Sequence, residues 1–315
     1  MNAINLFFQK LKAIYPTVKF SELIQTYETL SERYRFDTAN TALKNEKEVL
    51  VYCFGRLPAT LGVLEKVLTE YKTLTQRSVE SVTDLGCGPG ASAFILHDIF
   101  PDLKSILCVE NNPHMFQMAQ KLTQDMTDVV LTHEDIKTCR VAPTDVCLFS
   151  YSLGELTPIE QKLALEKAWI QSTQALIVIE PGTPQGFKTQ AYLRQLLIEK
   201  GAHILAPCGH NAPCPLLKDP TDWCHFPQKI MRNQEHQILK KGSLPYELEK
   251  YTYLIAIKTP VILDKKRLIR SPLKNHGHIT LDLCTESDLL RQTLTKSKNK
   301  QDYKRARHLN WGDLF

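Results

Sequence analysis

The stretch that decides the fold is SVTDLGCGPG at residues 81–90, an apolar strand that runs into a loop with three glycines. Glycine lets the backbone turn sharply and lets a ligand approach without a Cβ in the way. Residues 91–100, ASAFILHDIF, follow as a predicted helix, whose first turn offers free N–H groups and the positive end of a dipole. Strand, glycine loop and helix in this order predict a nucleotide-binding turn.

Downstream of this loop, short apolar strands alternate with amphipathic helices, and several strands are continuous apolar runs, as expected where both faces of a sheet are covered. This alternation predicts an α/β fold with a doubly wound, seven-stranded sheet whose last strand is antiparallel. The predicted strands are Ser81–Leu85, Ser105–Glu110, Val129–Thr132, Asp145–Tyr151, Ala175–Glu180, His203–Ala206 and Tyr251–Lys258.

Upstream, the first eighty residues have apolar side chains three and four positions apart and predict helices. Residues 56–60, RLPAT, interrupt them, because proline ends or kinks a helix. The predicted parts are a helical N-terminal region at 1–80, the sheet domain at 81–264 with a Cys-rich insertion at 207–250, and a basic C-terminal extension at 265–315.

The composition of the 315 residues is that of a globular protein, with 43% hydrophobic and 23% charged residues. No apolar run reaches the ~20 residues that cross a membrane, so we expect no membrane contact. The N-terminal residues lack the pattern of a secretion signal, which predicts a cytoplasmic protein in a bacterium or a mitochondrial matrix protein in a eukaryote. The nine cysteines are then expected to be thiols or metal ligands and not disulfides.

The excess of positive charge lies at the C-terminal end of the chain. Residues 265–315 contain twelve Lys or Arg and five Asp or Glu, whereas the rest contains 27 basic and 29 acidic residues. This asymmetry fits an anionic partner, most simply nucleic acid, and fits equally a solvated basic tail that keeps the protein soluble.

Two ligands compete for the glycine loop. Glu110 ends the second predicted strand, where a carboxylate accepts hydrogen bonds from both hydroxyls of a ribose. Gly86, Gly88 and Ala91 also spell G-x-G-x-x-A, a dinucleotide pattern. An ordinary dinucleotide strand is apolar up to its first glycine, whereas here Asp84 stands two residues before it, which favours a different nucleoside ligand.

The D-x-G-x-G-x-G spelling of residues 84–90 resembles the first motif of class I S-adenosylmethionine-dependent methyltransferases. The resemblance implies that this loop cradles the methionine part of S-adenosylmethionine and that Glu110 holds the ribose. It further places Asp135 against the adenine amine and Ile136 against the ring. The residues expected to bind the methyl donor are therefore Asp84, Gly86, Gly88, Gly90, Glu110, Asp135 and Ile136.

The segment after the fourth predicted strand, SYSLGEL at residues 150–156, is where groups that act on a methyl acceptor tend to lie. It lacks the Asn-Pro-Pro-aromatic signature of base-amine methyltransferases and the paired cysteines of RNA pyrimidine C5 enzymes. Glu155 is a candidate base and Tyr151 a candidate stacking residue, and both fit equally well as rim residues. The sequence therefore supports donor binding better than it supports methyl transfer.

Three cysteines fall within seventeen residues of the insertion, at Cys208, Cys214 and Cys224, in an irregular loop rich in proline. Closed soft-metal sites normally have four ligands, and the only cysteine downstream is Cys284. Ligation by Cys284 would tie the basic extension to the sheet domain.

Several metal readings of these residues stay open. Zinc and an iron–sulfur cluster both fit four thiolates, and His210 or His225 are further candidates for completing a zinc site. Buried, reduced cysteines in a loop are the reading without a metal.

Several segments together resemble the Rsm22 family, the methyltransferase-like assembly proteins of the small ribosomal subunit in mitochondria and bacteria. Beside the glycine loop these segments are RLPAT at 56–60, EPGTPQG at 180–186, PC at 207–208, PCP at 213–215, DWCHF at 222–226, GHITLDLC at 277–284, YKRAR at 303–307 and WGD at 311–313. The resemblance implies association with the small ribosomal subunit and its rRNA during assembly. It also implies a [4Fe–4S] cluster, whose ligands carry over to Cys208, Cys214, Cys224 and Cys284.

Three hypotheses follow from these residues. The favoured one is an assembly factor that binds rRNA of the small ribosomal subunit and has a cluster and a site for S-adenosylmethionine. The others are an active rRNA methyltransferase and a zinc-stabilised, nucleotide-dependent enzyme acting on small molecules. For RNA binding we expect Lys304, Arg305 and Arg307 to contact phosphates and Trp311 to stack on a base. Nothing in the sequence indicates an oligomeric state.

Overall fold

The computed structural model contains two compact units. The residues that it describes are 2–36, 42–262 and 265–315. The first unit comprises Met1–Thr173 and Gln228–Glu249, and the second comprises Gln174–Pro227 and Lys250–Phe315. The sequence-based boundary between residues 264 and 265 falls at residues 263–264, which lie outside the described residues.

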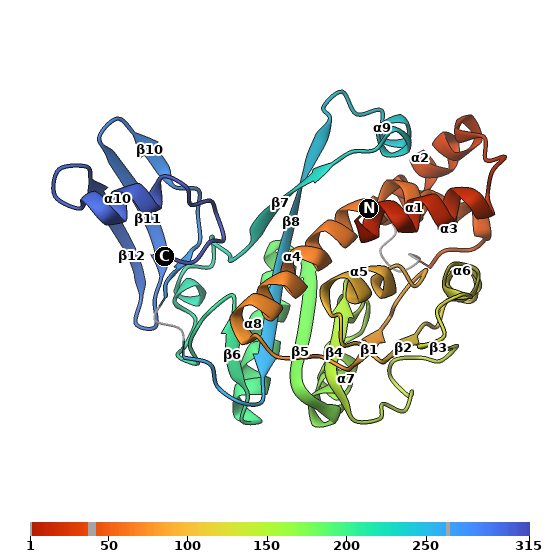
Figure 1. The fold of residues 1–315 in the computed structure, drawn as a ribbon, viewed down its shortest axis with the longest axis horizontal. Coiled ribbons are helices and arrows are strands. Elements are labelled where there is room, and N and C mark those ends of the chain that lie inside the picture. Colours follow the sequence, from red (N-terminus) through yellow and green to blue (C-terminus); the bar gives the residue numbers. More distant parts are fainter. Residues whose placement is uncertain (1, 37–41, 263–264) are drawn as a thin grey trace. The chain divides into compact units, whose positions relative to one another are not determined.

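Four helices open the first unit (Figure 1). They are α1 (Ala3–Ile14), α2 (Phe20–Phe36), α3 (Glu46–Gly55) and α4 (Leu57–Thr75). Asparagine side chains begin α1 and α3, where Asn2 and Asn45 each accept a backbone N–H of the first turn. The predicted break at residues 56–60 is confirmed, because Pro58 lies in the first turn of α4, where its missing N–H loses no hydrogen bond. None of the described helices combines the length and the apolar character needed to cross a membrane.

A parallel sheet completes the first unit. Its strands are β1 (Ser81–Leu85), β2 (Ser105–Val109), β3 (Val129–Thr132) and β4 (Thr144–Ser150), in the order β3-β2-β1-β4. The helices that connect or follow them are α5 (Ser92–Ile99), α6 (Pro113–Thr123), the short 3-10 helix η1 (Leu153–Glu155) and α7 (Pro158–Gln171). Because the strands are parallel, their carboxyl ends meet at one edge, which collects the glycine loop, Glu110 and residues 150–156.

The second unit contains most residues of three strands that pair antiparallel. Its elements are β5 (Ser172–Pro181), α8 (Pro184–Glu199), β6 (His203–Ala206) and β8 (Tyr246–Ile257). The last of these strands pairs antiparallel with β5 on one side and with β6 on the other. All seven predicted strands are therefore present, and the predicted antiparallel direction of the last one is confirmed.

The insertion between β6 and β8 is partly regular, which differs from the prediction of an irregular loop. It contains the 3-10 helix η2 (Pro215–Lys218), β7 (Phe226–Met231) and α9 (Gln234–Lys240), and β7 pairs with β8. In β7 only Phe226 and Ile230 are buried. Because this strand is short and its buried and exposed residues do not alternate, its sequence has no hydrophobic period from which a strand could be predicted.

The C-terminal extension folds into a second sheet, so the reading of a solvated tail is wrong. Its elements are β9 (Arg267–Leu268), β10 (Leu273–Asn275), β11 (His278–Cys284), β12 (Leu289–Thr295) and α10 (Lys300–Ala306), with strand order β10-β11-β12 and β9 beside β11. The core of this sheet buries every second residue of β11, namely Ile279, Leu281 and Leu283, together with Leu268 and Leu294.

Candidate functional site

The glycine loop after β1 has a backbone conformation that glycine adopts without strain. Gly86, Gly88 and Gly90 have φ angles of 86°, 58° and 74°. A Cβ added at Gly86 would lie 2.4 Å from the Cβ of Ser152, whereas one at Gly88 would meet no heavy atom of the described residues within 4 Å. The loop is therefore closely packed at Gly86 and open at Gly88, where a ligand has access.

Glu110 lies directly after β2, and two backbone donors hold its carboxylate. The N–H of Gly88 donates to one oxygen at 2.8 Å, and the N–H of Asn112 donates to the other at 2.7 Å. Burial raises the pKa of Glu110, and these backbone hydrogen bonds act in the opposite direction. Because each carboxylate oxygen has two lone pairs, Glu110 retains the capacity to accept hydrogen bonds from the hydroxyls of a ribose.

Asp84, near the end of β1, is a buried carboxyl beside the loop. Ser92 donates a hydrogen bond to its Oδ2, whereas Oδ1 is enclosed and has no hydrogen-bond partner among the described residues. Burial raises the pKa of Asp84 to about 7; the hydrogen bond from Ser92 lowers it, and the charge of Glu110 raises it. An enclosed acceptor without a donor costs about 1–3 kcal/mol, which a bound cationic group or a water at the loop would relieve.

We expect Asp84→Asn to flatten the pH dependence of stability. Folding raises the pKa of Asp84 from 3.8 to about 7, so the folded chain binds this proton more tightly than the unfolded chain does. The stabilisation is fully present below about pH 4 and is lost as the pH rises to about 7, by as much as ~4 kcal/mol. Urea unfolding of both proteins across this pH range measures the difference, and identical profiles would contradict the assignment.

Asp135 and Ile136 follow β3 in a turn that α7 holds in place. Lys167 donates to the carbonyl oxygen of Ile136 at 2.8 Å and to that of Cys139 at 2.9 Å. Asp135 is half-buried and pairs with Lys137 at 3.2 Å, while Ile136 is buried. The Asp135 carboxylate, which is expected to contact the adenine, is thus already paired with a lysine of the same turn. Lys167 holds the backbone of this turn in place.

An aromatic pair close to Glu110 is a feature that the sequence reasoning missed. The rings of Phe116 in α6 and His133 after β3 stack with centroids 4.9 Å apart. A ring nitrogen of His133 lies 2.9 Å from the carbonyl oxygen of Asn111, and positive charge on this ring lowers the pKa of Glu110. Flat rings beside the carboxylate that is expected to hold a ribose suit a nucleobase. The available signal was that both residues come shortly after consecutive strands.

The segment after β4 packs against the end of β1. The Ser152 hydroxyl donates to the carbonyl oxygen of Leu85 at 2.5 Å. Tyr151 has a φ of 60°, in the left-handed region that residues other than glycine rarely adopt. Glu155 is exposed, yet desolvation by surrounding protein atoms and the charge of Glu110 raise its pKa. Both observations hold for a carboxyl that lines an open hollow, so Glu155 lies at the rim of the site.

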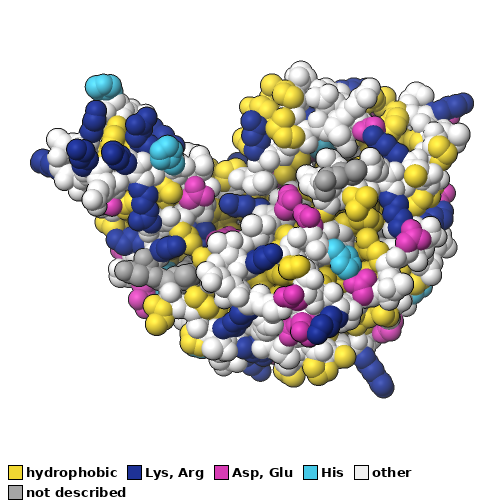
Figure 2. Space-filling view, in the orientation of Figure 1, with side chains coloured by type: hydrophobic (Ala, Val, Ile, Leu, Met, Phe, Trp, Pro, Cys, Tyr) yellow, Lys and Arg dark blue, Asp and Glu magenta, His cyan; other side chains and the backbone are white. Residues whose placement is uncertain are grey.

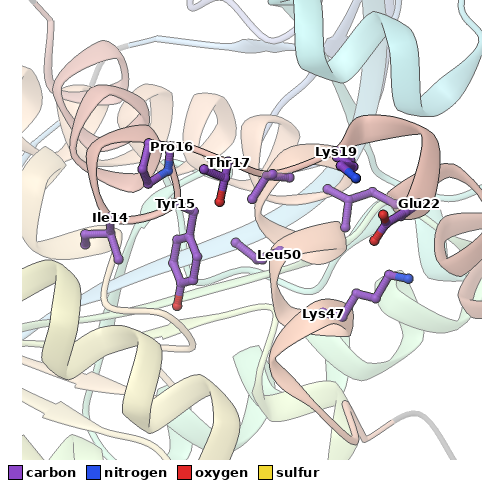
Figure 3. A pocket seen from close by; sticks show the side chains of 10 residues that line it. Ile14, Tyr15, Pro16, Thr17, Lys19, Glu22, Lys47 and Leu50 are labelled. Atoms are coloured by element: carbon purple, nitrogen blue, oxygen red, sulfur yellow. The ribbon is translucent and has the colours of Figure 1, made fainter.

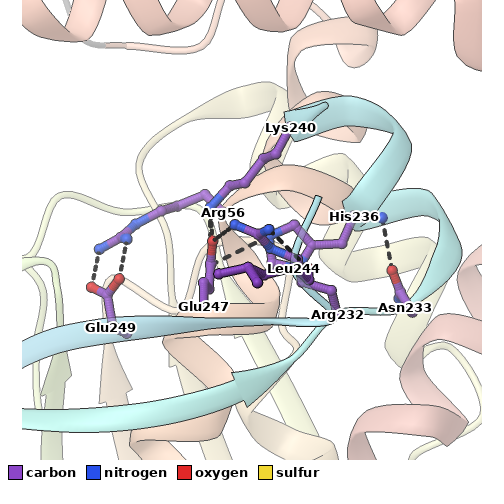
Figure 4. Close-up of polar contacts among 8 residues, drawn as sticks. All are labelled: Arg56, Arg232, Asn233, His236, Lys240, Leu244, Glu247 and Glu249. Atoms are coloured by element: carbon purple, nitrogen blue, oxygen red, sulfur yellow. Dashed lines mark hydrogen bonds and ion pairs between the residues drawn. The ribbon is translucent and has the colours of Figure 1, made fainter. Parts of the chain in front are cut away.

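Arg56, from the RLPAT segment, lies over the ring of Tyr151 and forms an ion pair with Glu249, and Figure 4 shows this ion pair. Its guanidinium carbon lies 5.3 Å from the centroid of the Tyr151 ring, and its two terminal nitrogens each lie 2.8 Å from the carboxylate of Glu249. Burial lowers the pKa of Arg56, but the carboxylate of Glu249 more than offsets this and raises it overall. A charged pair therefore supports the unusual backbone of a candidate catalytic residue, a role that RLPAT did not reveal.

Glu247 gathers three basic side chains in the same part of β8 (Figure 4). Arg232, Lys240 and His236 lie 3.1, 2.8 and 3.3 Å from its carboxylate oxygens. Desolvation raises the pKa of Glu247, but the hydrogen bonds and charges of His236 and Lys240 lower it by more. This cluster ties α9 to β8 and has no feature that indicates a ligand.

A groove of about 320 Å³ beside the end of α1 contains none of the predicted site residues. Figure 3 shows Tyr15, Lys19, Glu22, Lys47 and Leu50 around it. Two lysines, a glutamate and apolar side chains give this groove no single chemical character. The chemistry predicted from the sequence lies at the strand ends and not in this hollow.

The structure brings together, in the second unit, the four cysteines expected as ligands. Cys208 follows β6, Cys214 precedes η2, Cys224 precedes β7 and Cys284 ends β11. Cys284 is buried in an apolar cluster against which Cys214 and Cys224 pack, and its thiol is hydrogen-bonded to that of Cys208. Three of these thiols come from one loop, and the fourth comes from a strand of the C-terminal sheet. All four lie in the same part of the second unit.

These thiols perturb one another. The hydrogen bond from Cys284 lowers the pKa of Cys208 to about 6, although burial acts in the opposite direction, and the charges of Arg194 and Arg267 lower it further. The hydrogen bond with Cys208 raises the pKa of Cys284, and burial and the negative charge of Cys208 raise the pKa of Cys284, Cys214 and Cys224 alike. One sulfur is therefore ready to be a thiolate, and a cation would be needed to ionise the others.

Arginine side chains also fix the backbone of the cysteine loop. Arg194 in α8 donates to the carbonyl oxygens of His210 at 2.7 Å and Ala212 at 2.8 Å. Arg267 in β9 donates to the carbonyl oxygen of Pro207 at 2.7 Å. Within the parts of the chain that the structure describes, no three His, Cys, Asp or Glu side chains are arranged as ligands of one metal ion. The thiols are gathered but do not form a ready site for a single ion.

The basic residues expected to contact RNA lie on one folded element. Lys304, Arg305 and Arg307 are exposed on or directly after α10, and Figure 2 shows Lys and Arg side chains gathered over the C-terminal sheet. The guanidinium carbon of Arg305 lies 5.0 Å from the ring centroid of Phe315, so this residue also packs on the chain's own end.

Trp311 has partners within its own unit. Its ring centroid lies 4.9 Å from that of His225 and 5.6 Å from the guanidinium carbon of Arg270. His225 in turn stacks on Trp223, with centroids 5.1 Å apart. The tryptophan expected to stack on a base is thus half-buried beside the cysteine loop.

Comparison with known sequences gives a family match across most of the chain. A family described as "Mitochondrial small ribosomal subunit Rsm22" matches residues 46–315. Rsm22-cox11 tandem protein 2 of Schizosaccharomyces pombe is 26% identical over 345 residues, which cover 89% of this chain and 44% of that protein. Ribosome assembly protein METTL17 of Homo sapiens is 24% identical, over 84% of this chain and 62% of that protein. The chain thus spans less than two thirds of these relatives.

Two solved structures with a similar arrangement are named as methyltransferases. A putative RNA methyltransferase from Pyrococcus horikoshii has a TM-score of 0.42 and 14% identity, over 62% of this chain and 82% of that chain. Magnesium protoporphyrin IX methyltransferase from Synechocystis has a TM-score of 0.42 and 12% identity, over 77% of this chain and 99% of that chain. The mixed α/β fold itself follows from the strand order and helices described above.

Proposed function

Because the chain belongs to the Rsm22 family, we propose that it is an assembly factor of the small ribosomal subunit that carries a [4Fe–4S] cluster and binds S-adenosylmethionine. The observation that carries the proposal is the family match across residues 46–315, which include the glycine loop and all four gathered cysteines. Relatives named as ribosome assembly proteins support the role in assembly. The same relatives are mitochondrial, which supports the mitochondrial alternative and not the bacterial cytoplasmic one.

The chemistry around the four thiols supports an iron–sulfur cluster. Four thiolates around such a core make an anionic centre, and Arg194 and Arg267 bring positive charge to Cys208. A structural zinc ion also takes four thiolates, so the sulfide content measured below separates the two centres. A bound cluster would join the cysteine loop to Cys284 of the C-terminal sheet.

The residues of the glycine loop fit S-adenosylmethionine. Gly88 leaves open space for a ligand, Glu110 has lone pairs left for a ribose, and Asp84 holds an enclosed acceptor that lacks a donor in the described chain. Phe116 and His133 offer a stacked aromatic surface close to Glu110. These residues bind and orient a nucleoside with a cationic group, and the donor supplies an electrophilic methyl group when bound.

One purification tests the proposal. The full chain is isolated without oxygen from cells that contain its native ribosomes, and iron, sulfide and zinc are measured together with co-sedimentation on the small subunit. We expect about four irons and four sulfides per chain and a fraction that sediments with small-subunit particles. Zinc without sulfide would contradict the cluster, and failure to sediment with any small-subunit precursor would contradict the assembly role.

A second candidate, an active rRNA methyltransferase, is favoured by the position of Glu155. Burial and the charge of Glu110 raise the pKa of Glu155, which supports a proton acceptor beside the expected donor site. Transfer of labelled methyl groups to small-subunit RNA decides between the candidates. If the wild-type protein binds particles but transfers no label, the enzyme hypothesis fails and the assembly role stands.

RNA binding by α10 gives a prediction of its own. We expect Lys304→Glu with Arg307→Glu to weaken binding to small-subunit RNA and to lower the slope of log K against log salt by roughly 0.7–0.9 for each lost phosphate contact. These two residues are chosen because both are exposed, whereas Arg305 packs on Phe315. Filter binding at several salt concentrations measures the slope.

The matched control for this experiment is Lys162→Glu. Lys162 is an exposed lysine on α7, so its reversal changes net charge without touching α10. Equal losses in the control and the double variant would show a general charge effect. An unchanged salt slope in the double variant would remove α10 from the RNA-binding surface.

A further inference from the structure

We infer that Arg194 and His210 donate hydrogen bonds to sulfur atoms of the iron–sulfur centre and thereby set its reduction potential. The inference rests on the proposed function, because it requires the cluster. It assigns a role to Arg194, which the motifs did not identify, and to His210, which the sequence offered only as a candidate zinc ligand.

Arg194 is a buried cation with an unmet donor. Its side chain is 6% exposed, and one terminal nitrogen already donates to the carbonyl oxygens of His210 and Ala212. Its Nε is enclosed and has no acceptor anywhere in the described chain. The groups on which its charge acts include the thiols of Cys208 and Cys214. A buried charged donor without an acceptor is costly, so an acceptor on the side of these thiols is expected.

His210 also has buried ring nitrogens without a hydrogen-bond partner in the described chain. Both nitrogens of its ring are enclosed, and neither has a hydrogen-bond partner among residues 2–36, 42–262 and 265–315. His210 lies two residues after Cys208 in the chain, and its carbonyl oxygen accepts a hydrogen bond from Arg194 at 2.7 Å. His225, the other histidine of the loop, differs because its Nδ1 lies 3.2 Å from the carbonyl oxygen of Trp223. The unmet ring nitrogens are therefore a property of His210 and not of the loop as a whole.

The centre supplies the acceptors that these donors lack. Thiolate and sulfide sulfur atoms accept N–H hydrogen bonds, and such bonds are among the factors that set the potential of a cluster. The reduced centre carries one more negative charge than the oxidised centre, so a hydrogen bond stabilises the reduced state more and raises the potential. No bond is broken and no proton is transferred in this role.

The decisive variant is His210→Phe in the full chain prepared without oxygen, because phenylalanine keeps a ring and removes the donor. We expect iron and sulfide contents equal to wild type and about a tenfold lower ratio of reduced to oxidised centre at a fixed potential, a shift of about 59 mV to more negative values for one electron. Lys200→Gln, a loss of charge at an exposed position directly after the helix that holds Arg194, is the control and should not shift the potential. Equal potentials in wild type and His210→Phe would overturn the inference.

A second measurement decides the matter even if His210→Phe loses the cluster. The reduced centre of the wild-type protein should show exchangeable protons coupled to the electron spin, in spectra compared between H₂O and D₂O. Their absence would overturn the inference. If the wild-type protein contains neither iron nor sulfide, the proposed function fails instead, so the two failures are distinguishable.

Discussion

Cys284→Ser is expected to strip the protein of iron and to open the C-terminal sheet to proteolysis. Cys284 ends β11, is 7% exposed, and is the one proposed ligand outside residues 208–224. A serine hydroxyl is a poor ligand for iron, so the site loses closure and the strand loses its link to the cysteine loop. Metal sites that cross-link a fold contribute on the order of several kcal/mol to stability.

Two measurements follow the consequences of this substitution. Iron per chain should fall from about four to less than one, and trypsin should cut residues 285–300 many times faster than in the wild-type protein. The core of Leu281 and Leu283 persists in the variant, so the sheet is released and not unfolded at once.

Cys139→Ser is the matched control for Cys284→Ser. Cys139 is also buried, and its thiol also donates weakly to a backbone carbonyl oxygen, at 3.6 Å against 4.0 Å for Cys284. It lies in the first unit and is not one of the gathered thiols. Full iron content in Cys284→Ser, or equal loss of iron in Cys139→Ser, would contradict the proposed ligand set.

The predictable part of the fold is the part in which burial follows the local sequence. The strands β1 to β6 are apolar runs, and all except β3 and β4 are separated by helices with caps such as Asn112, so their order could be read directly. The short strands β7 and β10 could not, because β10 is wholly exposed and is defined by its pairing with β11. The alternation of apolar and polar residues in HITLDLC could have predicted β11. The basic charge of the extension favoured the interpretation as a solvated tail instead.

The sites divide in the same way. Glycine conformation and the position of Glu110 follow from local geometry. Spacing grouped three of the cysteines, and Cys284 joined them as the only cysteine downstream and through the family resemblance. The contact of Arg56 with Tyr151 and the turn held by Lys167 join residues far apart in the sequence, so only the tertiary structure reveals them. The same holds for Arg194, because the packing of α8 decides which of its residues faces the loop.

Glu110→Ala is expected to lower the affinity for S-adenosylmethionine by at least about a hundredfold. Two charge-assisted hydrogen bonds to the ribose contribute about 1.5–3 kcal/mol each, and every 1.4 kcal/mol changes the dissociation constant about tenfold. The substitution also frees the N–H groups of Gly88 and Asn112, which the carboxylate now holds. Calorimetry with S-adenosylmethionine measures the loss, and thermal unfolding of the ligand-free variant shows whether the loop is still folded.

Glu155→Gln separates the ribose contact from a general effect of charge. Glu155 carries a carboxyl close enough to Glu110 for their charges to interact, but it is exposed at the rim and makes no expected donor contact. We therefore expect its affinity for S-adenosylmethionine to stay within about threefold of wild type, a change of less than ~0.7 kcal/mol. Equal losses in both variants would mean that negative charge alone attracts the cationic donor. Unchanged affinity in Glu110→Ala would mean that the carboxylate holds only the backbone of the loop, and the donor site would have to be sought elsewhere on the strand ends.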